Sequence, residues 1–181
     1  MIGKIIICLI IGYAFGCIET GIIVGKMNHI DIRNYGSGNS GSTNALRTLG
    51  KKAGAITFLG DVFKAIIPTL LVQYVIFPGL DLTKLLMLYT GLGVVLGHNF
   101  PCWLQFRGGK GIAATAGVMI VFSPIMSAFA LGIFIVSAIV SKYVSLSSLL
   151  VTTFFPIYVP KAKITIFLYF VRSFPFFDCS V

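Results

Sequence analysis

The chain has 181 residues, of which 57% are hydrophobic and only 10% are charged. A soluble domain carries about 25% charged residues, so this chain has too little polar surface to cover a globular fold, and its 16 Phe and 7 Tyr exclude a disordered chain. The composition predicts an integral membrane protein with six to seven helical spans of about 20 residues each. The net charge of +9 is interpreted as a topological signal and not as a nucleic-acid surface, because cytoplasmic loops of membrane proteins collect Lys and Arg.

The first apolar run, residues 5–24, is interrupted only by Glu19. It is longer than the apolar region of a cleaved signal peptide, so it predicts a first membrane span. The segment from Lys26 to Lys52 that follows is the only long polar stretch of the chain.

A second span is expected over residues 53–77 and a shorter third span over residues 82–96. The second span contains Asp61 and Lys64, three residues apart on one face of the predicted helix. Charged side chains inside a membrane are costly, so these two are expected to pair with each other or with the bundle interior.

The uncharged stretch of residues 112–141 is too long for one span, because a helix of that length would measure about 45 Å. Ser123-Pro124 is the predicted break between a fourth and a fifth span. Sixth and seventh spans are expected over residues 143–158 and 161–177. With the N-terminus outside, most basic residues lie on the cytoplasmic side.

The chain shows no internal repeat, so residues 1–181 are predicted to form a single all-α, polytopic membrane domain. The four cysteines lack the clustered spacing of a zinc site, and no metal or other cofactor is expected.

A glycine-rich run with many small polar residues forms the first polar constellation. Its backbone N–H groups can turn inward as an anion-binding nest, and its arginine supplies a charged fork suited to phosphate. Thr43 or Asn44 could cap a following helix. The alternative is an ordinary flexible loop between spans. The run reads Gly36-Ser37-Gly38-Asn39-Ser40-Gly41-Ser42-Thr43-Asn44-Ala45-Leu46-Arg47.

A second constellation also combines glycines with fixed cations, directly before a helix expected to start at residue 112. Gly108, Gly109 and Lys110 again give close backbone approach with one ammonium group. The alternatives are a topological role for Lys110 and a structural, hydrogen-bonded role for His98. The two parts of this constellation are Gly97-His98-Asn99-Phe100-Pro101 and Phe106-Arg107-Gly108-Gly109-Lys110-Gly111.

Both loops are predicted to lie on the same face of the membrane, which favours a protein that handles phosphate. Paired catalytic carboxylates, a Ser-His-Asp arrangement and a metal cluster are missing from the sequence. The chemistry is therefore expected to depend on positioning and electrostatic stabilisation.

The two motifs closely resemble the first two signature motifs of the bacterial acyl-phosphate:glycerol-3-phosphate acyltransferases, the PlsY family. The resemblance covers roughly residues 5–150, with residues 151–181 as a divergent tail. It implies a seven-span bundle in the bacterial inner (plasma) membrane, with the active site on the cytoplasmic face. It also implies transfer of a fatty acyl group from acyl phosphate to the 1-hydroxyl of glycerol 3-phosphate. A soluble partner synthase would supply the acyl phosphate within this family.

By motif position, the resemblance assigns phosphate binding and charge stabilisation to Ser37, Arg47 and Lys110, and a proton-relay or supporting role to His98. The remaining motif positions are expected to bind substrate: Gly36, Gly38, Asn39, Thr43, Asn44, Gly108, Gly109 and Ser148.

The chain departs from the family at its end, where a third motif with a catalytic His and Asn is expected. No His or Asn follows Asn99 in this sequence. An inactive, truncated homologue is therefore one alternative. A small transporter for an organic phosphate is another, because glycine-rich breaks next to helix starts also form transporter anion sites.

Overall fold

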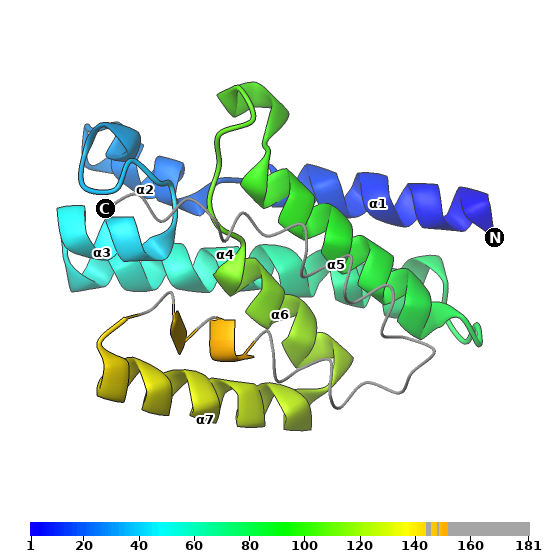
Figure 1. Ribbon diagram of the computed structural model, residues 1–181. Helices are drawn as coiled ribbons and strands as arrows, with labels where there is room; N and C mark the ends of the chain where they lie inside the picture. The colour runs from blue at the N-terminus through cyan, green and yellow to red at the C-terminus, as the bar shows by residue number, and fades with distance from the viewer. Residues whose placement is uncertain (144–145, 148, 152–181) are drawn as a thin grey trace. The chain divides into compact units, whose positions relative to one another are not determined.

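The computed structural model describes residues 1–143, 146–147 and 149–151, and every regular element in these residues is helical, which confirms the predicted fold class. The first compact unit comprises residues Met1–Phe122, and the second begins at Ser123. The helices of the first unit are drawn from blue to green in Figure 1. Its elements are α1 (Ile2–Gly16), α2 (Thr20–Met27), η1 (Ile32–Asn34), α3 (Ser42–Leu49), α4 (Lys51–Leu71), η2 (Val72–Ile76), α5 (Thr83–Asn99), η3 (Cys102–Leu104) and α6 (Ile112–Phe122).

Among the described residues, four helical stretches are long and apolar enough to cross a membrane, and α6 is a shorter apolar helix. The four stretches are Ile2–Met27, Lys51–Ile76, Thr83–Leu104 and Pro124–Ser141. The predicted seventh span, over 161–177, lies outside the described residues, and of the predicted sixth span, over 143–158, only 143, 146–147 and 149–151 are described. The chain is thus a multi-pass membrane protein with these four candidate spans in its described part.

The break expected at Ser123-Pro124 is confirmed. Helix α6 ends at Phe122, and α7 (Pro124–Ser141) begins at the proline. The Ser123 hydroxyl caps α7 by accepting a hydrogen bond from the backbone N–H of Met126 at 3.5 Å.

The structure confirms the predicted first span, residues 5–24, within the apolar helical stretch Ile2–Met27. This stretch contains a break, because α1 ends at Gly16 and α2 begins only at Thr20. The helix expected after the glycine-rich run is present as α3, which begins at Ser42. The N-cap of α3 is Gly41, without a side-chain cap, so the capping role expected for Thr43 or Asn44 is wrong.

Helices α1 and α5 cross at very short range because glycines face each other at the crossing. Gly12 and Gly16 of α1 contact the backbone of α5, and Gly93 and Gly97 of α5 contact the backbone of α1. This small-xxx-small pattern on both helices is typical of tight helix pairs in membranes, where close backbone approach replaces the hydrophobic effect. The crossing places the end of α5 beside the break between α1 and α2.

Two further hydrogen bonds hold the end of α5 at this break. The Tyr13 hydroxyl donates to the carbonyl oxygen of Phe100 at 2.8 Å, and the Trp103 indole N–H donates to that of Cys17 at 2.8 Å. The second bond satisfies a carbonyl at the end of α1 that the broken helix leaves without a partner.

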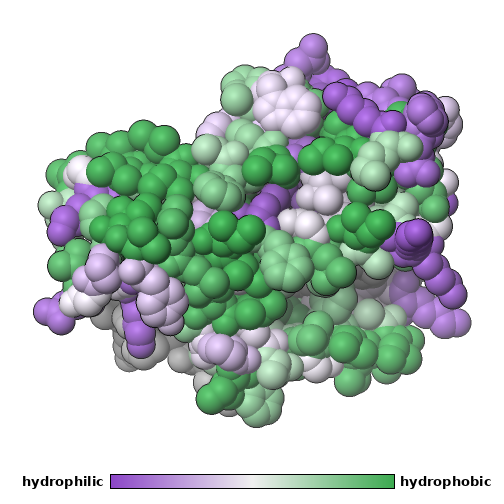
Figure 2. Space-filling view, turned by 180° about the vertical axis from the view of Figure 1, so that it is seen from behind, coloured by the Kyte–Doolittle hydropathy of each residue, from purple (hydrophilic) through white to green (hydrophobic). Residues whose placement is uncertain are grey.

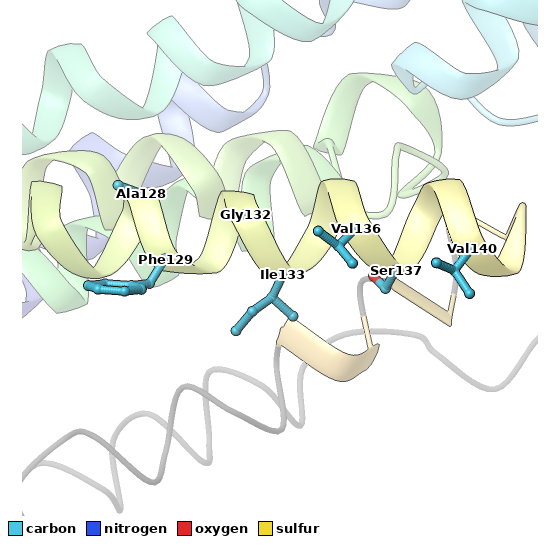
Figure 3. A pocket seen from close by; sticks show the side chains of 7 residues that line it. All are labelled: Ala128, Phe129, Gly132, Ile133, Val136, Ser137 and Val140. Carbon is cyan, nitrogen blue, oxygen red and sulfur yellow. The ribbon is translucent and has the colours of Figure 1, made fainter.

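In the second unit, one side of α7 lines a hollow (Figure 3). The lining residues recur at intervals that keep them on one face of the helix, and Ser137 is the only polar one, with its hydroxyl donating to the carbonyl of Phe134. The described residues that line the hollow include no charged group, and both glycine-rich motifs belong to the first unit. The hollow is lined by Ala128, Phe129, Gly132, Ile133, Val136, Ser137 and Val140.

Candidate active site

The first motif forms a tight loop organised by the side chain of Asn44, which is almost fully buried. Its Oδ1 accepts from the backbone N–H of Ser37 at 2.9 Å. Its Nδ2 lies 2.9 to 3.0 Å from three carbonyl oxygens, those of Ile32, Tyr35 and Asn39. Both ends of the Asn44 amide are therefore engaged within the protein, and its contribution is to hold the loop closed.

Two glycines of this loop adopt the left-handed conformation, Gly36 with φ +60° and Gly38 with φ +69°. Other residue types rarely adopt this conformation, so the turn on either side of Ser37 depends on glycine. The side chain of Ser37 is exposed, as are those of Thr43 and Arg47 in α3.

The second motif folds back onto the end of α5. The N–H of Gly108 donates to the carbonyl of Asn99 at 3.1 Å, and the N–H of Gly109 donates to that of His98 at 2.9 Å. A methyl group added to Gly109 would collide with the imidazole ring of His98 at Nε2. The glycine is thus required for close packing of the loop on the ring, and Lys110 follows on the exposed side.

The structure joins the two motifs. The side chain of Asn39 donates from Nδ2 to the carbonyl oxygen of Gly108 at 3.3 Å, and its Oδ1 accepts from the N–H of Gly41 at 2.8 Å. In Figure 1 the loop after α5 descends to the start of α6 near the segment that precedes α3. The two glycine-rich motifs therefore lie in contact and form one candidate site.

Two cations of this site have no ion-pair partner among the described residues. Arg47 and Lys110 are exposed and form no ion pair or side-chain hydrogen bond within the part of the chain that the structure describes. Hydrophilic residues gather on the side of the molecule that carries α3 and the start of α4, at the right of Figure 2. Uncompensated guanidinium and ammonium groups beside glycine-rich loops are suited to bind phosphate.

Arg33 differs from these two cations because it is already paired. Its guanidinium contacts the Asp31 carboxylate at 2.7 Å, and Asp31 also accepts from the backbone N–H of Arg33 at 3.0 Å. Hydrogen bonds from Arg33 lower the pKa of Asp31, although partial burial opposes this. The hydrogen bond with Asp31 in turn raises the pKa of Arg33. This pair fixes the short turn η1 ahead of the first motif.

A buried cluster of charged side chains lies beneath the two loops. The Lys64 ammonium on α4 contacts the Asp61 carboxylate at 3.0 Å, which confirms the pairing predicted for these two residues. Lys64 also lies 2.7 Å from Nδ1 of His98 and donates to the carbonyl of Ile18 at 2.7 Å. Glu19 completes the cluster, with Oε1 at 3.1 Å from Nδ1 of His98.

Sequence reasoning treated Glu19 only as an interruption of the first span and missed its place in the site. The available signal was a single carboxylate in an otherwise apolar run, since intramembrane acids are rare and usually functional. His98 is also buried, at 2% exposure, and not on the open face of the loop. Ser148, a predicted substrate-binding residue, lies outside the described residues.

Comparison with known proteins gives the same family throughout. A sequence profile of the family "Glycerol-3-phosphate acyltransferase" matches residues 6–177. The glycerol-3-phosphate acyltransferase of Clostridioides difficile (strain 630) is 44% identical over 160 residues, which cover 87% of this chain and 78% of that protein. The glycerol-3-phosphate acyltransferase of Bacillus subtilis (strain 168) is 40% identical over 155 residues, which cover 85% of this chain and 77% of that protein.

The fold resembles two crystal structures of PlsY, an integral membrane glycerol 3-phosphate acyltransferase. The glycerol 3-phosphate form matches with a TM-score of 0.81 and 34% identity. The lysophosphatidic acid form matches with a TM-score of 0.79 and 32% identity. Each match covers 93% of this chain and 84% of the PlsY chain.

Proposed function

The chain belongs to the glycerol-3-phosphate acyltransferase family, and we propose that it transfers a fatty acyl group from acyl phosphate to the 1-hydroxyl of glycerol 3-phosphate. The products are lysophosphatidic acid and inorganic phosphate. The observation that carries the proposal is the hydrogen bond between Asn39 and Gly108. It joins two motifs, each of which presents an exposed cation without an ion-pair partner in the described part of the chain. Two phosphate-bearing substrates require such a pair of anion-binding elements.

The reaction needs little base strength. The hydroxyl oxygen of glycerol 3-phosphate attacks the acyl carbonyl carbon, a new ester C–O bond forms, and the C–O bond to phosphate breaks. Phosphate departs with the electron pair, and the hydroxyl proton is transferred to the departing phosphate or to water. Negative charge develops on the carbonyl oxygen and on the leaving phosphate, so fixed positive groups lower the barrier.

The exposed residues have separate roles in this scheme. Arg47 offers a planar fork that binds two phosphate oxygens, and Lys110 offers a single point charge. The hydroxyls of Ser37 and Thr43 provide neutral donors. The N–H groups of Gly38, Gly108 and Gly109 donate to carbonyls within the protein, so these glycines shape the loops around the substrates. Ser148 is proposed as a further contact with acyl phosphate.

His98 and Asn44 act from below the surface. The imidazole of His98 packs against Gly109, and its backbone carbonyl accepts the N–H of Gly109. These contacts favour a supporting role for His98 over direct proton transfer to substrate. Asn44 and Asn39 shape the first loop through the hydrogen bonds of their amides.

We propose that the site faces the cytoplasm at the inner (plasma) membrane of a bacterial cell. The polar segment Lys26–Lys52 and the second motif both carry Lys and Arg, and short cytoplasmic loops collect these residues. A cytoplasmic site is open to soluble glycerol 3-phosphate and to acyl phosphate delivered from a soluble synthase. The acyl chain can remain between the spans.

The test supplies purified protein with palmitoyl phosphate and glycerol 3-phosphate and measures lysophosphatidic acid and inorganic phosphate. We expect the two products in equal amounts, and none when palmitoyl-CoA replaces palmitoyl phosphate. Product from the thioester alone would refute the proposed donor. Uptake of glycerol 3-phosphate into proteoliposomes without esterification would instead favour a transporter.

A further inference from the structure

We propose that Glu19 is a positioning residue that sets the two phosphate-binding loops relative to each other, through Ser40 on the first loop and through His98 of α5, on which the second loop packs. The inference rests on the proposed function, because it concerns how that site is held ready. Glu19 occupies the break between α1 and α2 at the N-cap of α2, and its side chain is fully buried.

The first contact ties Glu19 to the first motif. The hydroxyl of Ser40 donates to Oε2 of Glu19 at 2.7 Å, and both groups are buried. Ser40 directly follows Asn39, the residue that reaches Gly108 of the second motif. The backbone of Ser40 lies so close to Gly21 of α2 that a methyl group there would collide with it. The carboxylate therefore supports the loop from beneath, next to its bridge to the second loop.

The second contact ties Glu19 to the second motif. Its Oε1 lies 3.1 Å from Nδ1 of His98. Gly109 packs against the imidazole ring of this histidine, and the Gly109 N–H donates to the backbone carbonyl of His98. The two oxygens of one carboxylate thus act on different loops, which no other described side chain in the buried cluster does.

The cost of this arrangement argues for a functional reason. A carboxylate inside an apolar bundle is destabilising unless charged and hydrogen-bonding partners surround it. Here Lys64 lies 3.5 Å from Glu19 and 3.0 Å from Asp61, so one ammonium serves two carboxylates. Oε1 of Glu19 and Oδ1 of Asp61 accept no hydrogen bond from the described residues, so their contacts with Lys64 and His98 are electrostatic. An apolar residue at position 19 would pack without this cost.

The experiment compares Ser40→Ala and Glu19→Gln with a matched control, Thr69→Val. Thr69 is a fully buried residue of α4 whose hydroxyl donates to the Ala65 carbonyl of its own helix. We expect each cluster variant to raise the KM for glycerol 3-phosphate or palmitoyl phosphate about tenfold, with a smaller fall in kcat. The control should leave both constants unchanged.

If Glu19 and Ser40 only stabilised the fold, their substitution would lower the amount of folded protein and hence the maximal rate. The KM of the protein that remains folded would be unchanged. That result would overturn the proposal. The double variant Glu19→Gln/Ser40→Ala tests whether Glu19 and Ser40 act through their shared contact. The effects of two substitutions that remove the same contact do not add up. We expect the double variant to lose no more than the worse single variant, and losses that multiply would contradict the Ser40 link.

Hydrogen exchange gives a readout that does not depend on turnover. In full-length protein in detergent micelles, both cluster variants should speed amide exchange in residues 36–44 and 106–111, and Thr69→Val should not. Unchanged exchange in both loops would refute the positioning role even if activity fell. Absence of acyl transfer by the unmodified protein would refute the proposed function, and the exchange result would still decide the role of Glu19.

Discussion

The side chain of Asn39 and the backbone of Gly108 are 69 positions apart in the sequence and are joined by a hydrogen bond of 3.3 Å. Oδ1 of the same Asn39 side chain accepts a hydrogen bond from the backbone N–H of Gly41. One side chain thus closes its own loop and docks that loop onto the second motif. The alignment of the two loops proposed to bind phosphate depends on this residue.

Replacement of Asn39 by Ala is expected to weaken binding of both phosphate substrates. The variant removes the bridge to Gly108 and the bond to Gly41, each worth about 1 kcal/mol. We expect kcat/KM to fall about tenfold or more, with most of the change in KM. Asn34→Ala is the control, because Asn34 is exposed and its side chain makes no hydrogen bond within the described residues. An Asn39→Ala enzyme with unchanged KM values would contradict the bridge.

Arg47→Ala and Lys110→Ala are each expected to lower kcat/KM by tenfold or more, if each cation stabilises the transition state by over about 1.4 kcal/mol. The measurement is initial rates over a range of both substrates. Lys52→Ala is the control, since Lys52 is an exposed cation at the start of α4 outside both motifs. The assignment of phosphate binding fails if all three variants lose activity equally or none loses it.

Gly109→Ala is expected to abolish most activity by moving the second loop away from His98. The added methyl group would collide with the imidazole, and overpacking of a tight contact costs about 1–3 kcal/mol. Gly132→Ala in α7 is the control, because open space surrounds its position. Activity and thermal stability are both measured. A fully active Gly109→Ala enzyme would show that loop and ring are not packed together in solution.

The sequence alone predicted those features that depend on local pattern. The pair Asp61 and Lys64 followed from helical spacing, and the break at Ser123-Pro124 followed from the backbone preferences before proline. Both are confirmed. The two glycine-rich motifs were identified from residue types, and the structure brings them together.

The features that sequence reasoning missed depend on tertiary contacts. The N-cap of α3 is Gly41 and not the expected Thr43 or Asn44. This helix of eight residues is stabilised by packing on α4, where Leu46 lies against Gly54. The break after Gly16 is held by Trp103, which comes from a distant loop. The role of Glu19 needs partners from three other segments, so a linear pattern could not show it.

Asp31→Asn is expected to destabilise the protein slightly, in a manner that depends on pH. Arg33 lowers the pKa of Asp31 in the folded state, so the carboxylate stabilises the fold at any pH above its unfolded-state pKa of about 3.9. This stabilisation is lost as the pH falls through the lower, folded-state pKa. Both side chains are about one-third exposed, so the effect is small.

The check is thermal unfolding of both proteins in detergent micelles at stepped pH. The difference in Tm between the unmodified chain and Asp31→Asn should be constant near neutral pH and should shrink below about pH 4. Asp81→Asn is the control, because Asp81 is exposed and forms no ion pair among the described residues. A difference that stays constant down to the lowest pH would show that Arg33 does not perturb Asp31.

Gly93→Ala tests whether the tight crossing of α1 and α5 positions the site. A methyl group on Gly93 would collide with the backbone of α1 at Leu9 and Tyr13. Helix propensity alone would favour Ala over Gly by about 1 kcal/mol, so a fall in Tm must come from the lost packing. Gly3→Ala is the matched control, because no atom lies within 4 Å of the added group, and it should leave Tm unchanged or raise it.

The same substitution should also reach the active site. His98 follows Gly97, which packs on Tyr13 of α1 and on Cys17 directly after this helix, and so sets the distance between His98 and Glu19. If the crossing separates, the contact of 3.1 Å between these two residues is lost, and the second loop loses its support. We therefore expect the folded fraction of Gly93→Ala to show a raised KM at temperatures well below its Tm. A destabilised variant with unchanged KM values would mean that the crossing maintains the fold without positioning the site.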